Sequence, residues 1–136
     1  MTAKEYLSQA RYLDARINSK ISQVDRLNDL ATSATSVLTG MPHSPNKATS
    51  KMADVVDKIV DLQAEINRDI DKLVDLKKEM RDVIGAIPEV EQQTILEQRY
   101  LCFLKMEQIA VDMGYSIQHL YRLHDEALKN IVIPQR

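Results

Sequence analysis

Apolar residues recur every three or four positions over about residues 3 to 38. The repeating apolar set is Leu13, Ile17, Ile21, Val24, Leu27, Ala31 and Ala34. Charged and amide side chains occupy the positions between them, so the apolar side chains fall on one face of a helix. This first stretch is therefore predicted to form a long amphipathic helix.

A second stretch, from about residue 50 to residue 85, has a stricter repeat. Its apolar positions alternate by four and three, like the a and d positions of a coiled coil, with one polar break at Asp69. They are Val55, Ile59, Leu62, Ile66, Asp69, Leu73, Leu76, Met80, Val83 and Ile87. Gly40, Pro42 and Pro45 interrupt the helical pattern and predict a loop at 39–49. A loop this short lets the two helices fold back into an antiparallel helical hairpin, a coiled coil.

The second helix carries more apolar residues than one partner helix covers. A further apolar stripe flanks the main repeat: Val56, Val60, Ile70, Val74 and Ile84. An exposed stripe of this kind usually marks an association surface. We expect a homo-oligomer, with a dimer favoured and two hairpins forming a four-helix bundle. The alternative is that the first helix covers a broad face of the second.

Shorter helices separated by tight turns are predicted in the last part of the chain. Pro88 suits the first turn of a helix, and Gly114 can adopt the left-handed conformation that ends one. Ser116 is a favoured N-cap, and Leu120 and Leu123 supply a buried face to the helix that follows. The expected helices span residues 88–103, 105–113 and 116–131. Their short connections predict a helix-turn-helix.

Together these patterns predict an all-α protein in two parts. Residues 1–86 form the helical hairpin, a coiled-coil association region. Residues 87–136 form a compact three-helix domain that contains the helix-turn-helix. A helix-turn-helix most commonly places its second helix in a DNA major groove, so double-stranded DNA is the expected partner.

Composition limits where such a protein resides. With 44% hydrophobic and 28% charged residues, the chain fits a folded, water-soluble protein. No window approaches the roughly 20 apolar residues of a membrane span, and the N-terminus lacks the apolar core of a signal peptide. The single cysteine, Cys102, fits a reducing compartment. We expect a cytoplasmic protein without membrane association, in which Cys102 is a half-buried structural thiol.

No motif in the chain indicates an enzyme. His119 and His124 are five residues apart, whereas zinc motifs on a helix use a spacing of four. A Gly-rich phosphate loop, a Ser/His/Asp set and a cluster of metal ligands are all missing from the sequence. We therefore expect no catalytic residues, no metal and no cofactor.

The residues of the last part also resemble region four of bacterial sigma factors, the domain that reads an upstream promoter element. The shared pattern is a hydrophobic residue before Pro, then Leu-x-x-Arg-Phe/Tyr, then Glu-Ile-Ala before Leu/Met-Gly-x-Ser/Thr, and a closing Ala-Leu. Its counterparts here are Ile87-Pro88, Leu96 to Tyr100, Glu107 to Ala110, Met113 to Ser116, and Ala127-Leu128. The match covers about residues 87–131, a third of the chain.

A long helical hairpin ahead of a sigma-like helix-turn-helix is similar to small phage-encoded proteins of Gram-positive bacteria, including the ArpU-type late-gene regulators. The resemblance implies a sequence-specific DNA-binding protein that regulates phage or prophage transcription. It also implies the base-reading positions of the recognition helix, which here are Ile117, Gln118 and Arg122. Gln118 can pair with adenine and Arg122 with guanine. Ile117 replaces the arginine typical of the family, so that contact is lost or becomes apolar.

Further residues of the same helix are expected at the DNA. Tyr121 lies beside Arg122 in the sequence and can reach a phosphate or sugar. Ser116 can bond a phosphate as well as cap the helix, and His119 is expected at the surface near DNA. The alternative for each of these positions is an ordinary solvated helix face.

The charge of the chain weighs against DNA binding by a single copy. The net charge is −2, and in residues 105–131 three basic side chains face four acidic ones. DNA affinity comes largely from Lys and Arg at phosphates, so a monomer should bind weakly. Dimerisation remedies this by linking two binding heads. Two other functions remain open: a module that docks on RNA polymerase without reading DNA, and a subunit like the phage small terminase.

Overall fold

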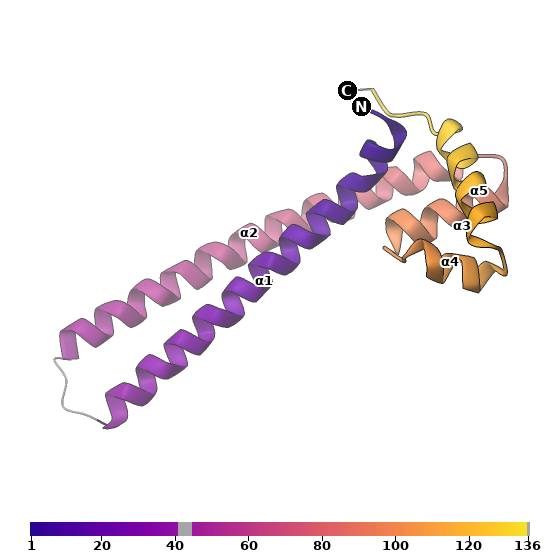
Figure 1. Cartoon of the computed structure of the whole chain (residues 1–136). Helices are drawn as coiled ribbons and strands as arrows, with labels where there is room; N and C mark the ends of the chain where they lie inside the picture. Colours follow the sequence, from indigo (N-terminus) through magenta and orange to yellow (C-terminus); the bar gives the residue numbers. More distant parts are fainter. Residues whose placement is uncertain (41–44, 136) are drawn as a thin grey trace. The chain divides into compact units, whose positions relative to one another are not determined.

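The computed structural model describes residues 1–40 and 45–135, and the side chains of residues 1–33 and 50–135. Its elements are α1 (Ala3–Gly40), α2 (Pro45–Gly85), α3 (Val90–Leu96), η1 (Glu97–Leu101), α4 (Met106–Met113) and α5 (Ile117–Lys129) (Figure 1). The short π-helical segment η1 continues α3 directly. The described residues contain no strand, so the all-α prediction is confirmed. None of the described helices has an apolar stretch long enough to cross a membrane.

The two long helices begin where the sequence offers local stabilisation. At the start of α1, Thr2 Oγ1 accepts from the backbone N–H of Glu5 (3.2 Å), and Glu5 Oε2 accepts from the N–H of Thr2 (3.4 Å). This reciprocal pair is a capping box. α2 begins at Pro45, whose fixed φ suits a first helical turn. The loop prediction of 39–49 was therefore too long: residues 39–40 and 45–49 are helical, and 41–44 lie outside the described residues.

The chain forms two compact units, and the long helices contribute to both. The hairpin unit consists of Ala15–Asp71, and the head unit combines Met1–Asp14 with Lys72–Arg136. This division differs from the expected boundary between residues 86 and 87. The reason is packing: the start of α1 and the end of α2 share one hydrophobic core with the C-terminal helices.

In the hairpin unit, α1 and α2 run antiparallel and meet along the predicted seam. Ile17, Val24 and Ile66 are buried there, whereas Ile21 remains 42% exposed. The predicted polar break at Asp69 is 7% exposed and holds a salt bridge with Lys20, Nζ to Oδ2, at 2.6 Å. The break in the apolar repeat is thus filled by a buried ion pair.

The second apolar stripe of α2 divides between surface and core. Four of its members are 40–59% exposed: Val56, Val60, Ile70 and Val74. The fifth, Ile84, was wrongly assigned to this stripe, since it is completely buried beside Met80 and Ile87 in the head unit. The C-terminal helices surround this end of α2 on more sides than one partner helix could.

Two hydrophobic clusters build the head unit. The first contains Tyr6, Leu7, Ala10, Met80, Ile84, Ile87, Leu96, Tyr100 and Ala127. The second contains Ile95, Met106, Ile109, Ala110 and Leu120. Because Ile95 and Leu96 are neighbours in α3 and belong to different clusters, this helix packs on both sides. It is the central element on which α4 and α5 rest.

The helix predicted at 88–103 is shorter and less regular than expected. Pro88 precedes the extended N-cap Glu89 and is not part of the first turn. The Gln93 side chain instead closes the end of α2, donating to the backbone carbonyls of Gly85 and Ile87. After η1, Phe103 has a positive φ of 60° and the ammonium of Lys77 lies 4.6 Å from its ring centre. The helix therefore ends before Phe103, and α4 can start in a new direction.

Candidate nucleic-acid interface

The turn between α4 and α5 has the geometry that the sequence predicts. Gly114 adopts φ 72° and ψ 31°, the left-handed conformation that favours glycine. The N–H of Tyr115 donates to the carbonyl of Ala110 at 2.9 Å, and that of Gly114 donates to Val111 at 3.2 Å. These bonds satisfy the last carbonyls of α4 and reverse the chain sharply. The direction of α5 is therefore set by the backbone of this turn.

Ser116 caps α5 as predicted. Its backbone is extended (φ −68°, ψ 155°), and its Oγ accepts from the N–H of His119 at 3.2 Å. The serine is exposed and its hydroxyl hydrogen is not used by the cap. It can donate to a phosphate oxygen while the cap stays in place.

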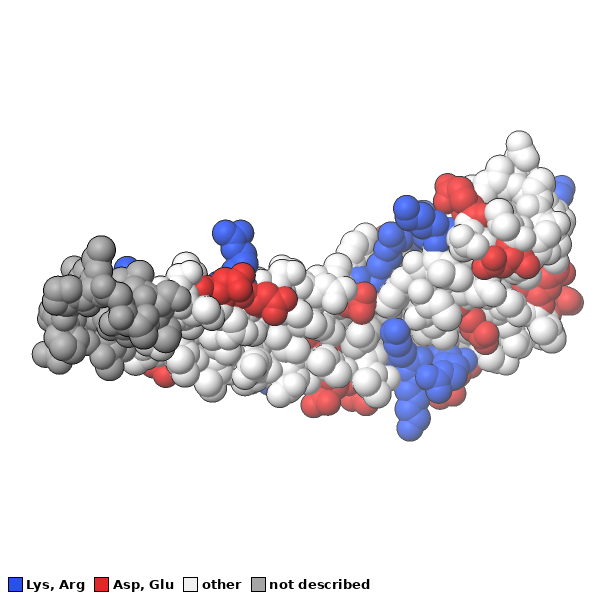
Figure 2. Space-filling view, turned by 90° about the horizontal axis from the view of Figure 1, so that it is seen from below, with Lys and Arg blue, Asp and Glu red and all other residues white. Residues whose placement is uncertain are grey.

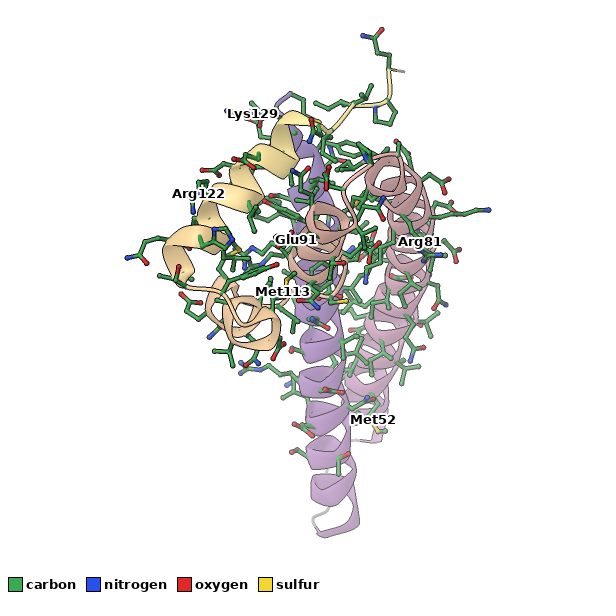
Figure 3. All side chains as sticks on the ribbon, turned by 90° about the vertical axis from the view of Figure 1, so that its right-hand side faces the viewer. Met52, Arg81, Glu91, Met113, Arg122 and Lys129 are labelled. Carbon is green, nitrogen blue, oxygen red and sulfur yellow. The ribbon has the colours of Figure 1, made fainter. Side chains whose placement is uncertain are left out.

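One side of α5 is fixed in the core, and this leaves the other side free. Leu120, His124 and Ala127 are buried at spacings of four and three. On the opposite side Gln118, Tyr121 and Arg122 are exposed. Figure 3 labels Arg122 and Lys129 along this helix. The structure thus groups three of the predicted DNA-contacting side chains on the accessible face of α5.

Ile117 and His119 differ from these three, because both are half-buried. Ile117 packs against the second hydrophobic cluster, which explains why an apolar residue follows the cap. Part of its surface is therefore unavailable for a contact with a thymine methyl group. His119 is covered by Tyr115, whose ring meets the imidazole edge-on with centres 4.9 Å apart.

His119 also holds Arg122. Arg122 Nη2 lies 2.8 Å from His119 Nδ1, one helical turn away. A guanidinium only donates hydrogen bonds, so Nδ1 must accept and the ring proton must reside on Nε2. The imidazole of His119 is itself positioned by Tyr115. A chain of three side chains thereby restricts the orientation of the arginine head group.

The buried His124 is a structural residue that the sequence prediction did not identify. Its Nε2 lies 2.8 Å from the hydroxyl of Tyr100, and the two rings stack with centres 5.7 Å apart. Burial lowers the pKa of His124 and raises that of Tyr100, so both groups are held neutral. The spacing from Leu120 and Ala127 was the available signal, since it places His124 on the buried face of the helix.

The far end of α5 is attached to α3 by side-chain amides. Asn130 Nδ2 donates to Gln92 Oε1 at 2.7 Å, and Gln92 is 9% exposed. Together with the Tyr100–His124 contact, this bond fixes α5 at two points along its length. A helix held in this way can present its outer side chains without reorganising the unit.

The surface around α5 has mixed charge. Lys105, Arg122 and Lys129 are exposed, and so are the acidic residues Glu107, Asp112, Asp125 and Glu126. On the face seen in Figure 2, both acidic and basic side chains lie on the surface of the half of the molecule opposite the grey residues. Few phosphates can be neutralised by such a surface.

The other candidate reactive groups are the thiol of Cys102 and possible metal ligands. Cys102 is exposed directly after η1, so the expectation of a half-buried thiol was wrong. The N–H of Cys102 donates to the carbonyl of Glu97 at 3.0 Å, the last π-helical bond of η1, and its side chain is exposed to solvent. Within the described residues, no three His, Cys, Asp or Glu side chains come close enough to hold a metal ion.

Comparison with known proteins gives one result, which covers most of the head unit and about half of the hairpin unit. No curated protein and no solved structure is significantly similar to the chain. A family model described as a protein of unknown function, DUF1492, matches residues 44–132. That range begins at the start of α2 and extends past the end of α5, and it exceeds half of the chain. The protein belongs to the DUF1492 family.

Proposed function

We propose that this protein is a sequence-specific DNA-binding regulator of phage or prophage transcription. The observation that carries the proposal is the division of α5 into a fixed and a free side. Leu120, His124 and Ala127 lock the helix, while Gln118 and Arg122 remain exposed beyond a left-handed turn and a serine cap. A helix presented in this way can enter a major groove with its N-terminal residues toward the bases.

Each exposed side chain has a distinct role in this proposal. Gln118 makes paired hydrogen bonds to adenine, and Arg122 makes them to guanine. Tyr121 and the hydroxyl of Ser116 contact phosphate or sugar and fix the register of the helix. The likeness of residues 87–131 to sigma region four supports the same assignment, and so does the similarity of a hairpin followed by a helix-turn-helix to ArpU-type regulators. Ile117 contributes mainly to packing, because most of its surface is already covered by the second hydrophobic cluster.

The mixed charge around α5 makes self-association part of the proposal. A single head neutralises few phosphates, so one copy binds weakly at physiological salt. Two heads joined through their helical hairpins bind in a linked manner, which raises apparent affinity by roughly 10²–10⁴. The exposed stripe of α2 supplies an apolar surface for this association.

The proposal is tested by binding measurements on DNA selected from a random duplex pool. Fluorescence anisotropy compares the enriched duplex with a scrambled one at fixed salt. Arg122→Ala and Gln118→Ala should each weaken binding to the enriched duplex by about 1–3 kcal/mol. Arg11→Ala is the matched control, since it removes an exposed arginine from α1 and should leave sequence preference unchanged. Unchanged binding by the Arg122→Ala, Gln118→Ala double variant would show that these two residues do not recognise the bases.

The same mixed charge favours a second candidate, a module that docks on RNA polymerase without reading DNA. A surface with both signs of charge suits a protein partner better than a polyanion. Retention of purified polymerase on the immobilised protein, together with failure to enrich any duplex, would support this candidate. Enrichment of one duplex without polymerase retention would exclude it.

A further inference from the structure

The exposed guanidinium of Arg122 is held by a neutral group (Figure 3). Its Nη2 donates to His119 Nδ1 at 2.8 Å. Asp125 and Glu126 follow at the spacing of one helical turn, but none of the ion pairs found among the described residues includes Arg122. Long side chains on a helix lean toward its N-terminus, so the arginine reaches back to the histidine. The head group is therefore held in place while its positive charge stays uncompensated.

His119 is itself fixed at two points, its backbone and its ring. Its N–H donates to the Oγ of the cap residue Ser116 at 3.2 Å. Its imidazole meets the ring of Tyr115 edge-on, at an interplanar angle of 85° and with centres 4.9 Å apart. Tyr115 packs in turn against the second hydrophobic cluster. The orientation of the imidazole, and with it that of Arg122, is thus set from the core of the head unit.

Holding Arg122 affects which DNA group it contacts. An arginine side chain has many rotamers, and ordering such a side chain on binding costs free energy. An unrestrained guanidinium on this surface can donate to any phosphate within its reach, and such a contact carries no sequence information. The bond to His119 uses one donor of the guanidinium and leaves the others available for O6 and N7 of guanine. A held arginine is therefore better suited to reading one base than to a general attraction for phosphates.

We propose that His119 is a positioning residue that sets the specificity of Arg122 for guanine without contacting DNA itself. Its Nδ1 is the acceptor that orients the guanidinium, and Tyr115 keeps this acceptor in place. The inference rests on the proposed function, because it concerns the base that Arg122 reads. It differs from the expectation that His119 meets DNA directly.

Two substitutions separate the acceptor of His119 from its ring. His119→Phe keeps an aromatic ring beside Tyr115 and removes the acceptor. His119→Asn removes the ring and places a carboxamide oxygen close to the position of Nδ1. Neither substitution alters the formal charge of the chain, which counts histidine as neutral. If the acceptor is what matters, the asparagine variant should behave like the unmodified protein and the phenylalanine variant should not.

The first measurement is made without DNA, by ¹⁵N relaxation of the Nε–H group of Arg122. We expect restricted motion in the unmodified protein and in His119→Asn, and free motion in His119→Phe. Arg99 is the internal control, since its Nη1 donates to the carbonyl of Leu104 at 3.0 Å, away from this site. Its restricted signal should persist in every variant and shows that the head unit is folded. Equal mobility of Arg122 in the unmodified protein and in His119→Phe overturns the proposal.

The second measurement is the base preference of each variant, determined by selection from a random duplex pool. Arg122→Ala first identifies the base pair that Arg122 reads, as the position where the preference for guanine disappears. At that same base pair, His119→Phe should reduce the preference for guanine about two- to tenfold, because the arginine must now be ordered on binding. His119→Asn should retain the preference, and binding to a scrambled duplex should be unchanged in both variants.

Three results would contradict this role for His119. The first is a full preference for guanine in His119→Phe. The second is a loss at a different base pair, which would mean that His119 contacts a base itself. The third is an equal loss in His119→Asn, which would assign the effect to the ring and not to the acceptor.

Failure of the inference is distinguishable from failure of the proposed function. An unmodified protein that enriches no duplex rejects the proposed function and the specificity role together, whatever the mobility of Arg122. An enriched duplex whose guanine is still preferred by His119→Phe rejects the inference alone.

Discussion

The hairpin unit and the head unit are built from the same two long helices but bury them differently. In the head unit, Leu7, Met80 and Ile84 are completely inaccessible to solvent. In the hairpin unit, the best-buried apolar residues are still 5–8% exposed, and most seam positions are half-buried. A third layer, provided by α3 to α5, makes the difference in the head unit. The contrast shows that the same apolar repeat is buried completely only where a third layer of helices covers it.

The largest expected effect is that of removing a core isoleucine from the head unit. Ile84→Ala should lower the free energy of unfolding by about 3–4 kcal/mol, because the cavity it leaves is enclosed on all sides. Ile59→Ala, at a half-buried seam position of the hairpin unit, should cost about 1–2 kcal/mol. Urea unfolding followed by circular dichroism measures both. Equal losses of unfolding free energy in the two variants would show that the two units are packed equally well.

A smaller loss of stability is expected when the ion pair between Lys20 and Asp69 in the hairpin unit is broken. Lys20→Met or Asp69→Leu alone should cost about 2 kcal/mol, because each breaks the 2.6 Å contact at a site where both side chains are at most 12% exposed. After Asp69→Leu, Lys20 retains only the longer 3.8 Å contact with Glu65 among its ion pairs. The double variant should recover much of this loss, because a Met–Leu contact continues the apolar seam. A double-mutant cycle measures the coupling. Additive losses would mean that the pair stabilises nothing.

The smallest expected effect is a pH dependence of stability, which arises from His124 in the head unit. Burial lowers the pKa of His124 below its unfolded value of about 6.5, so the neutral ring stabilises the folded state. This stabilisation is complete above pH 6.5 and is lost as the pH falls toward the pKa of the folded protein. Unfolding measured between pH 7 and 5.5 should therefore show falling stability.

His124→Gln should flatten that dependence, and His119→Gln, which keeps His124, should retain it. If the slope persists without His124, the acid sensitivity originates elsewhere and the Tyr100 contact does not control it.

Much of the fold follows from apolar periodicity, because each helix buries one face. The seam of α2 and its break at Asp69 were predicted, and the structure confirms that none of the seam positions is exposed. The partner of Asp69 was not predicted, since Lys20 meets it only through the stagger of two helices distant in sequence. Ile84 was misassigned for a similar reason. Its heptad position placed it in the exposed stripe beside the main seam, but helices that come later in the chain cover its side chain.

The candidate interface was predictable to a comparable extent. Gly114 and Ser116 act through local backbone geometry, which their residue types already indicate. The bond between His119 and Arg122 could not be inferred from their spacing alone, because it depends on the side-chain rotamers and on Tyr115. The contribution of Tyr6 and Leu7 to the head unit was also missed. Their partners lie at the other end of the chain, and no local pattern reports contacts at such separation.

The contribution of Tyr6 and Leu7 has a consequence for synthesis on the ribosome. These residues leave the exit tunnel well before Ala127, which shares their core and is added more than a hundred residues later. The hairpin helices can form and meet while translation continues. The head unit can close only when α5 has emerged. The N-terminal end of α1 must therefore wait without its C-terminal packing partners until α5 has been synthesised.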